Sequence, residues 1–456
     1  MGSQAAGSFL YPHHVNRETH RSTGGFHRGV TPLLIMRISP KSTLPAALVL
    51  LGIILLINYR WDAPSAGKAN TISAGGLASD SSGKAESRPA ATKRDSEATR
   101  AAAKKWHAEL LEKYPEFAVK YRDIPDEKNG YLQLILLMEK MGPDGLSGLK
   151  GFRDGLTLGG EIDLAAAGKW LAENKEILDQ ILRIAGLPSQ SSKDVPTNRF
   201  AGLGGGGSEH RFVLLLNARY AMSTGDKATA LRSYAAALNM ANHCDGIEAP
   251  SLLNAVAAVG LRQSVGEELV KQLPQLAGDA QALADARALL GRAMKEEPNL
   301  ERVAVGEWNY GMLEFFLPEF LGDNPQGQVE FQSPQVIIDY YSEQMKLLAK
   351  GGKQAGWDQV IEPIATAAPP SSLTEEEKRF LNFALSDSFR TCFTGFLMAR
   401  SQQAMHDAAL AIVAGESMPV EPLTGEPFLW DPATRTLSAP AKFDQVKATI
   451  LPIQVP

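Results

Sequence analysis

The chain has 456 residues, of which 44% are hydrophobic and 21% are charged, and its formal net charge at pH 7 is −5. This composition is ordinary for a globular protein and too polar for a transporter with many membrane spans. Residues 1–61 contain six basic side chains and one acidic side chain, so residues 62–456 carry a net charge of −10. An acidic body offers no electrostatic basis for binding nucleic acid, and we expect no nucleic-acid partner.

The run from Leu44 to Ile57 contains no charged residue. Extended by its polar neighbours to residues 42–61, it is long enough to cross a lipid bilayer as one helix. More basic residues precede this segment than follow it, so the positive-inside rule places residues 1–41 in the cytoplasm. The sequence therefore predicts a single-pass protein of the inner membrane, whose body lies in the periplasm.

A cleaved signal peptide is the other interpretation of the same run. The residues from Met36 to Lys41 would form its basic beginning, and Met36 is also a candidate for the true start of the chain. Cleavage requires small residues soon after the apolar run, whereas residues 58–62 include Tyr59, Arg60 and Trp61. The uncleaved anchor is therefore the preferred interpretation, and both interpretations export the body.

Residues 62–95 are rich in Ala, Ser, Gly and Lys and have almost no large apolar residues, which is typical of a flexible linker. Apolar residues then recur at helical spacing and predict an N-terminal helical lobe over residues 96–187. Its expected helices span residues 96–114, 131–138 and 163–186. The last of these ranges divides into two short helices, with Asn174 placed to cap the second.

Residues 188–208 have no periodicity and include a glycine-rich stretch, which predicts a loop or linker between two lobes. Gly202, Gly204 and Gly207 satisfy a bare G-x-G-x-x-G pattern. A dinucleotide site needs a buried strand directly before such glycines, and residues 194–199 do not have the sequence pattern of a buried strand. The ending of a P-loop is also missing from this stretch. The sequence therefore predicts no nucleotide cofactor.

A second helical lobe is predicted over residues 209–415, and it opens with an αα-hairpin over residues 211–242. Some residues of this hairpin match the small and aromatic positions of a tetratricopeptide-type repeat: Ala218, Gly225, Ala230, Tyr234 and Ala237. No second copy follows about 34 residues later. The predicted fold class is therefore mainly α: a single N-terminal transmembrane helix and a helical-hairpin bundle or short α-solenoid, with a small C-terminal β-hairpin.

Further periodic segments complete this lobe. Helices are expected over residues 250–266, 280–295 and 334–350, and as one long run from residue 374. Thr374 and Glu377 form a capping box at the start of that run, so the neighbouring acids are interpreted as a helix start and not as catalytic carboxylates. Residues 416–456 form an extended tail, in which Pro427 to Ser438 predict the β-hairpin.

Two parts of the chain resemble segments of a known protein family. Residues 214–231, together with Leu238 to His243 and Leu252 to Asn254, resemble a family of uncharacterised envelope proteins from planctomycete and verrucomicrobial bacteria. That family has a single N-terminal anchor, helical hairpins and a C-terminal segment of the kind Pro-x-Asp-Pro-hydrophobic-Thr-Gly-Lys-Pro-Leu. Residues 420–428 echo this segment, with Glu421 in place of the aspartate and Glu426 in place of the lysine. The resemblance implies the topology and no activity.

Residues with catalytic chemistry are sparse. His243 and Cys244 are adjacent, but neighbours on a helix point about 100° apart and do not form a nucleophile and base pair. An exported Cys244 could pair with Cys392 or remain a buried free thiol. Glu209 and His210 are the one polar pair worth testing for catalysis. No catalytic, cofactor-binding or metal-binding residue is predicted.

Two hypotheses follow for the function. The first is a scaffold or protein-interaction module of the cell envelope, in which stacked hairpins bind an envelope protein that the sequence does not identify. The second is an envelope hydrolase whose site is assembled from residues far apart in the chain. A concave site with converging His, Asp or Glu side chains would favour the hydrolase.

Overall fold

The computed structural model describes residues 96–455, apart from 142–145, 147, 158–160, 198, 200–208, 296–298, 323–330, 352–366, 383, 386–387, 441–449 and 451. The predicted transmembrane helix over residues 42–61, the linker over residues 62–95 and the glycine-rich stretch over residues 202–208 lie outside the described residues. Among the helices that the structure does describe, none is both long enough and apolar enough to span a bilayer.

The described chain is mainly helical, as predicted, and begins with five helices of 8 to 18 residues. Their bounds are Ser96–Lys113 for α2, Gly130–Met141 for α3, Lys150–Thr157 for α4, Leu164–Glu173 for α5 and Lys175–Ala185 for α6. Helix α4 was not predicted. Asn174 does precede α6, but its side chain makes no cap there, because its Nδ2 donates back to the Trp170 carbonyl at 2.8 Å.

The predicted αα-hairpin is confirmed. Helix α8 spans Glu209–Ser223 and α9 spans Lys227–Asp245. The turn between them needs a left-handed residue, and Gly225 supplies it with a φ of 84°. The Asp226 side chain then caps α9 by accepting from the Thr229 amide at 3.0 Å. Ala218, Ala230 and Tyr234 are fully buried between the helices, but the likeness to a tetratricopeptide-type repeat stays a prediction.

The remaining helices follow in chain order. Their bounds are Leu252–Lys271 for α10, Leu273–Leu276 for α11, Ala280–Lys295 for α12, Leu300–Gly311 for α13, Leu317–Phe320 for α14, Pro334–Gly351 for α15, Glu375–Asn382 for α17 and Ser388–Ala414 for α18. A π-helical turn, Met312–Phe316, joins α13 to α14. Helices α13 and α14 were not predicted, and the run expected from residue 374 is divided into α17 and α18.

The predicted capping box at α17 is confirmed. The Thr374 amide donates to Glu377 Oε2 at 2.9 Å, and the Glu377 amide donates to Thr374 Oγ1 at 3.2 Å. The amides of Gln332 and Ser333 also donate to Glu377 Oε1, at 2.8 and 2.9 Å. Glu377 therefore ties the start of α15 to the start of α17, in addition to capping its own helix.

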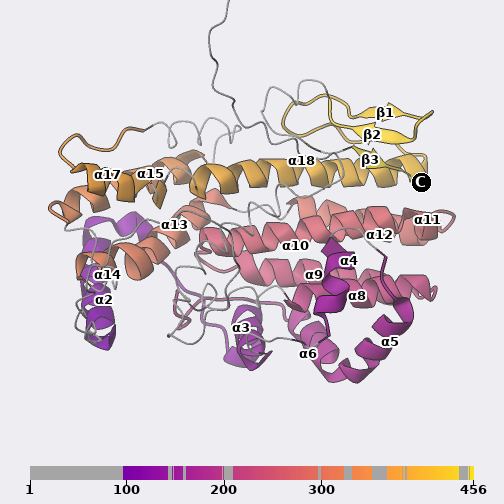
Figure 1. Cartoon of the computed structure of the whole chain (residues 1–456), viewed down its shortest axis with the longest axis horizontal. Helices are drawn as coiled ribbons and strands as arrows, with labels where there is room; N and C mark the ends of the chain where they lie inside the picture. Colours follow the sequence, from indigo (N-terminus) through magenta and orange to yellow (C-terminus); the bar gives the residue numbers. More distant parts are fainter. Residues whose placement is uncertain are drawn as a thin grey trace, which may run out of the picture. The chain divides into compact units, whose positions relative to one another are not determined.

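The long helices pack partly against their neighbours in the chain and partly against helices far away in sequence. Figure 1 shows α18 lying along α10 and α12, while α10 also contacts α9, which pairs with α8. Two hydrophobic clusters fill the spaces between these helices. One contains Ile181 together with Leu214, and the other contains Leu110 together with Trp308. Both clusters thus combine helices from either side of the predicted interlobe segment 188–208.

The predicted C-terminal β-hairpin is confirmed and gains a third strand. Strand β1 spans Leu429–Asp431, β2 spans Thr436–Ser438 and β3 spans Ile453–Gln454, paired antiparallel in the order β1-β2-β3. Leu437 of β2 is fully buried, and β2 contacts α18. The sheet is thereby fastened to the last long helix.

The loop before this sheet is built around a buried carboxylate. Glu421 is fully buried and accepts hydrogen bonds from the amides of Leu423 and Thr424. The Ser401 hydroxyl of α18 donates to the same carboxylate. Because Ser401 is also fully buried, this contact holds the loop against the helix.

Candidate functional site

A polar cluster lies at the α9–α10 junction, defined as residues 245–252. Arg262 of α10 is buried and pairs with Asp245 through two hydrogen bonds, of 2.7 and 2.9 Å. Arg302 of α13 donates to the Asp245 carbonyl at 2.9 Å and to the carbonyls of Ile247 and Glu248. The end of α9 and the turn that follows it are therefore held by guanidinium groups from two different helices.

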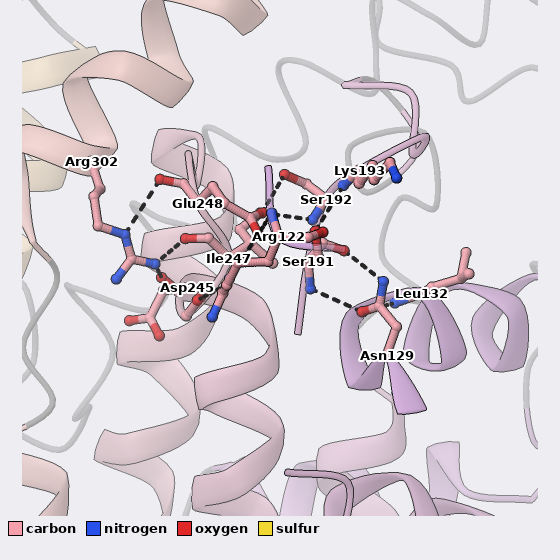
Figure 2. A network of polar contacts seen from close by, with 11 residues as sticks. Arg122, Asn129, Leu132, Ser191, Ser192, Lys193, Asp245, Ile247, Glu248 and Arg302 are labelled. Carbon is pink, nitrogen blue, oxygen red and sulfur yellow. Dashed lines mark hydrogen bonds and ion pairs between the residues drawn. The ribbon is translucent and has the colours of Figure 1, made fainter. Parts of the chain in front are cut away.

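Glu248 extends this cluster to the segment that precedes the glycine-rich stretch. Figure 2 shows its carboxylate between Arg122 and Ser192, accepting from the Arg122 Nε at 2.8 Å and from the Ser192 amide at 3.0 Å. Burial would raise the pKa of Glu248, but these hydrogen bonds lower it to about 2. The carboxylate is thus ionised at neutral pH and serves as a fixed acceptor.

Asn129 holds the same segment from its other side. Its Nδ2 donates to the Ser191 carbonyl at 2.9 Å, and its Oδ1 accepts from the Ser191 amide at 3.0 Å (Figure 2). An amide side chain that pairs with both polar groups of one residue imitates a neighbouring strand. Residues 189–192 are consequently clamped between Asn129 and Glu248.

Glu307 of α13 lies directly beside the junction. Its Oε2 accepts from the amide of Leu252, the first residue of α10, at 2.8 Å. Helix α13 reaches this position because Gly306 has no side chain: a Cβ there would lie 2.3 Å from the Pro250 carbonyl oxygen. The carboxyl group therefore meets the N-terminal end of α10 at close range.

The surroundings of Glu307 favour its protonated form. Burial raises the pKa of this carboxyl to about 7, and the hydrogen bond from Leu252 opposes the rise only in part. The titratable side chains on which its charge acts are Tyr310, Tyr341 and Cys392, all of them neutral at that pH. Glu307 is therefore a group that can take up or release a proton near neutral pH, which is a property of general acids and bases.

The histidine and cysteine singled out in the sequence have structural roles. His243 is buried against Gly130, and its Nε2 lies 2.9 Å from the Ile184 carbonyl oxygen. Burial lowers the pKa of His243 and raises the pKa of Cys244 to about 12. A thiol with such a pKa stays protonated at neutral pH. Of the two alternatives that the sequence left open, the structure has the free thiols: Cys244 and Cys392 are both buried and form no disulfide.

The Glu209 and His210 pair is placed at the start of α8. His210 is buried, while the side chain of Glu209 lies outside the described residues. Within the described part of the chain, no group of three or more His, Cys, Asp or Glu side chains could hold a metal ion.

The charged residues at and around the junction were missed in the sequence. Glu248, Arg302 and Glu307 belong to no motif, and their partners lie more than 50 positions away in the chain, as with the 55 positions between Leu252 and Glu307. One local signal was present: Ser251 and Asn254 form a capping box that marks the start of α10.

Comparisons with known proteins give no assignment, because no family model, no curated protein and no solved structure matches this chain.

Proposed function

We propose that this protein is a scaffold or protein-interaction module of the cell envelope, anchored in the inner membrane by residues 42–61. Its N-terminal residues 1–41 lie in the cytoplasm and its helical body in the periplasm, where it binds an envelope protein. The charge-free apolar run and the excess of basic residues before it support the anchor and its orientation.

One observation carries the scaffold part of the proposal. The junction joins four separate segments, represented by Arg122, Ser192, Asp245 and Arg302, through an exposed ion pair of Arg122 with Glu248 and partly buried hydrogen bonds of Ser192 and Arg302. A helical body cross-linked in this way keeps its surfaces in fixed positions. A rigid surface loses less conformational entropy when it binds a partner, which is the physical advantage of a preorganised scaffold.

The test begins with topology. A reporter enzyme that is active only in the periplasm is fused after Pro456, and intact spheroplasts of the same strain are treated with protease. We expect an active reporter and a membrane-bound, protease-sensitive body. An inactive reporter with a protected body would overturn the orientation.

The partner is then sought by site-specific photocrosslinking in living cells. A photoreactive residue replaces an exposed apolar side chain of the body, Tyr121 or Leu347, which are 51% and 41% exposed. The matched control carries the same residue at Leu348, which is fully buried one position along α15. Crosslinks to one discrete envelope protein from the exposed sites alone are expected. Equal crosslinking from Leu348, or crosslinking only to abundant bulk proteins, would contradict a specific interaction.

A hydrolase remains the second candidate because of Glu307. A carboxyl group with a pKa of about 7 is suited to donate a proton to a leaving group at neutral pH. Under this hypothesis a strain that carries Glu307→Gln has the same growth phenotype as a strain from which the gene is deleted. The photocrosslinks of the variant stay in place. Under the scaffold hypothesis Glu307→Gln preserves both wild-type growth and the photocrosslinks.

A further inference from the structure

The first described helix and the turn after it pack around one tryptophan of α13. The N-terminal arm, defined as residues 96–117, comprises α2 and the 3₁₀ turn Pro115–Phe117. Trp308 is fully buried, and three rings of the arm lie against it. Their centroids are 4.6 to 6.1 Å from the Trp308 centroid, and they belong to His107, Tyr114 and Phe117. The arm is therefore docked on α13 through an aromatic contact.

His107 is also hydrogen-bonded to α13. Its Nε2 lies 2.9 Å from Asn309 Oδ1. The Asn309 Nδ2 donates to the carbonyls of Phe117 and Val305, at 3.0 and 2.8 Å, which fixes the orientation of the amide group. The Asn309 Oδ1 is therefore the acceptor, so neutral His107 carries its proton on Nε2. Its Nδ1 is the nitrogen that takes up a second proton.

The docked position disfavours the charged form of His107. Burial lowers the pKa of His107 below its usual 6.5, and the hydrogen bond to Asn309 opposes this only in part. The bond to Asn309 survives protonation, because Nε2 donates in both forms, but protonation places a charge in a largely desolvated site. Of the four histidines in the described residues, His107 is half-buried and the other three are buried. His107 therefore meets the smallest desolvation penalty when it is protonated.

The ion pairs that hold the arm to α15 do not titrate in the same range. Asp339 accepts from Lys113 Nζ at 2.8 Å and from the Tyr114 hydroxyl. Glu116 pairs with Lys346 at 2.8 Å. Burial raises the pKa of both carboxyl groups, but these hydrogen bonds lower it below the usual value. Both carboxylates therefore stay ionised between pH 5.5 and pH 7.5.

Other charged groups near the arm do not act on His107. On α2 and on the elements packed against it, these are Lys104, Glu307, Glu314, Glu319 and Glu343. The pKa of His107 is set by burial and by Asn309, and not by any of these charges. Glu307 does titrate at about pH 7, but its proton stabilises the folded state as pH falls. Glu307 therefore cannot explain a loss of arm packing on acidification.

We propose that His107 makes the docking of the N-terminal arm sensitive to pH, so that the arm opens more often as the surroundings become acidic. The open arm takes up a proton at Nδ1 more readily, because its imidazole ring is hydrated there. Docking is consequently most stable above pH 6.5 and weakens as pH falls below that value. The proposal does not depend on the membrane anchor or on the scaffold function.

The test is hydrogen exchange of the full chain in a mild nonionic detergent, followed by mass spectrometry, at pH 7.5 and pH 5.5. Exchange is expressed as protection factors, which are corrected for the intrinsic effect of pH on the exchange rate. We expect the protection of α2 to fall by about three- to tenfold between these values, because the open arm gains at most one proton over this interval. Helix α12, which contains no histidine and lies in the other hydrophobic cluster, should keep its protection.

The decisive variant is His107→Gln, and its matched control is Glu109→Gln. Glutamine stays neutral and keeps an N–H group for Asn309 Oδ1. His107→Gln should therefore retain the protection of α2 at pH 7.5 and lose most of the fall at pH 5.5. Glu109 is an exposed residue of the same helix, and Glu109→Gln should respond to pH as the wild type does.

A direct measurement of the pKa of His107 keeps the proposal testable if His107→Gln does not dock its arm at either pH. Exchange of the hydrogen on the imidazole carbon between the two nitrogens reports this pKa in the wild type, and we expect a value below 6.5. A value of 6.5 or above overturns the proposal. It is equally overturned if the protection of α2 does not change with pH, falls no more than that of α12, or falls to the same extent in His107→Gln.

Discussion

Glu307→Gln should change how the stability of this protein depends on pH. The pKa of the Glu307 carboxyl is raised from 4.5 to about 7 in the folded chain, mainly by burial. A raised carboxyl pKa means that the folded state binds this proton more tightly than the unfolded state does. Its contribution to stability is therefore fully present below pH 4.5 and is lost as pH rises through about 7.

The size of the effect follows from the pKa difference. At about 1.4 kcal/mol for each pH unit, the interval from 4.5 to about 7 corresponds to about 3 kcal/mol. Glu307 is only half-buried, so screening by solvent reduces this value to about 2 kcal/mol. Glutamine resembles the protonated acid in shape and charge, and its amide oxygen can still accept from the Leu252 amide.

The measurement is urea unfolding of the wild type and of Glu307→Gln at pH 5 and pH 8.5. We expect similar free energies of unfolding at pH 5, and at pH 8.5 a variant that is about 2 kcal/mol more stable than the wild type. Glu109→Gln, at an exposed position of α2, is the control and should leave the pH profile unchanged. A difference between Glu307→Gln and wild type that does not vary with pH would refute this reasoning.

Three further predictions follow from the described contacts and from the sequence. Arg262→Met should destabilise the protein by about 3–5 kcal/mol in urea unfolding, because it leaves Asp245 charged and buried without its partner; a loss below about 1 kcal/mol would contradict a buried pair. Glu377→Ala should lower the free energy of unfolding by about 1–2 kcal/mol, since it removes the cap of α17 and the acceptor for the amides at the start of α15. An unchanged unfolding midpoint would argue against that role of Glu377. Leu51→Arg should move the protein from the membrane fraction to the soluble fraction in cell fractionation, because a charge at the centre of a span costs about 3 kcal/mol. The control Ser65→Arg, in the predicted linker, should stay in the membrane fraction. Retention of Leu51→Arg in the membrane fraction would contradict the anchor.

Local sequence was sufficient for much of the helical architecture. Helices α2, α3, α8, α9, α10, α12 and α15 appear where apolar periodicity predicted them. The capping box of Thr374 and Glu377 and the αα-hairpin over residues 211–242 were predicted from residues close to one another in the chain. Such signals are readable because helix caps and tight turns depend on short-range hydrogen bonds and backbone angles.

Helix α13 was missed because its local signals are weak. Gly306 is a poor helix former, yet it lies inside α13, where its missing side chain allows close contact with the Pro250 carbonyl. Tertiary packing therefore overrides local propensity at this position. The same contact brings Glu307 to the start of α10, so the site and the helix that carries it were missed together.

The amino-acid sequence determined the helical class, the positions of most helices and the topology that we propose, because each depends on residues near one another in the chain. Tertiary structure alone decided which charged groups meet: Arg122 with Glu248, and Arg262 with Asp245. It likewise decided the pKa of Glu307, which is set by burial and by an amide far away in sequence. Desolvation and charge act through distance in space, and neither can be read from the order of residues.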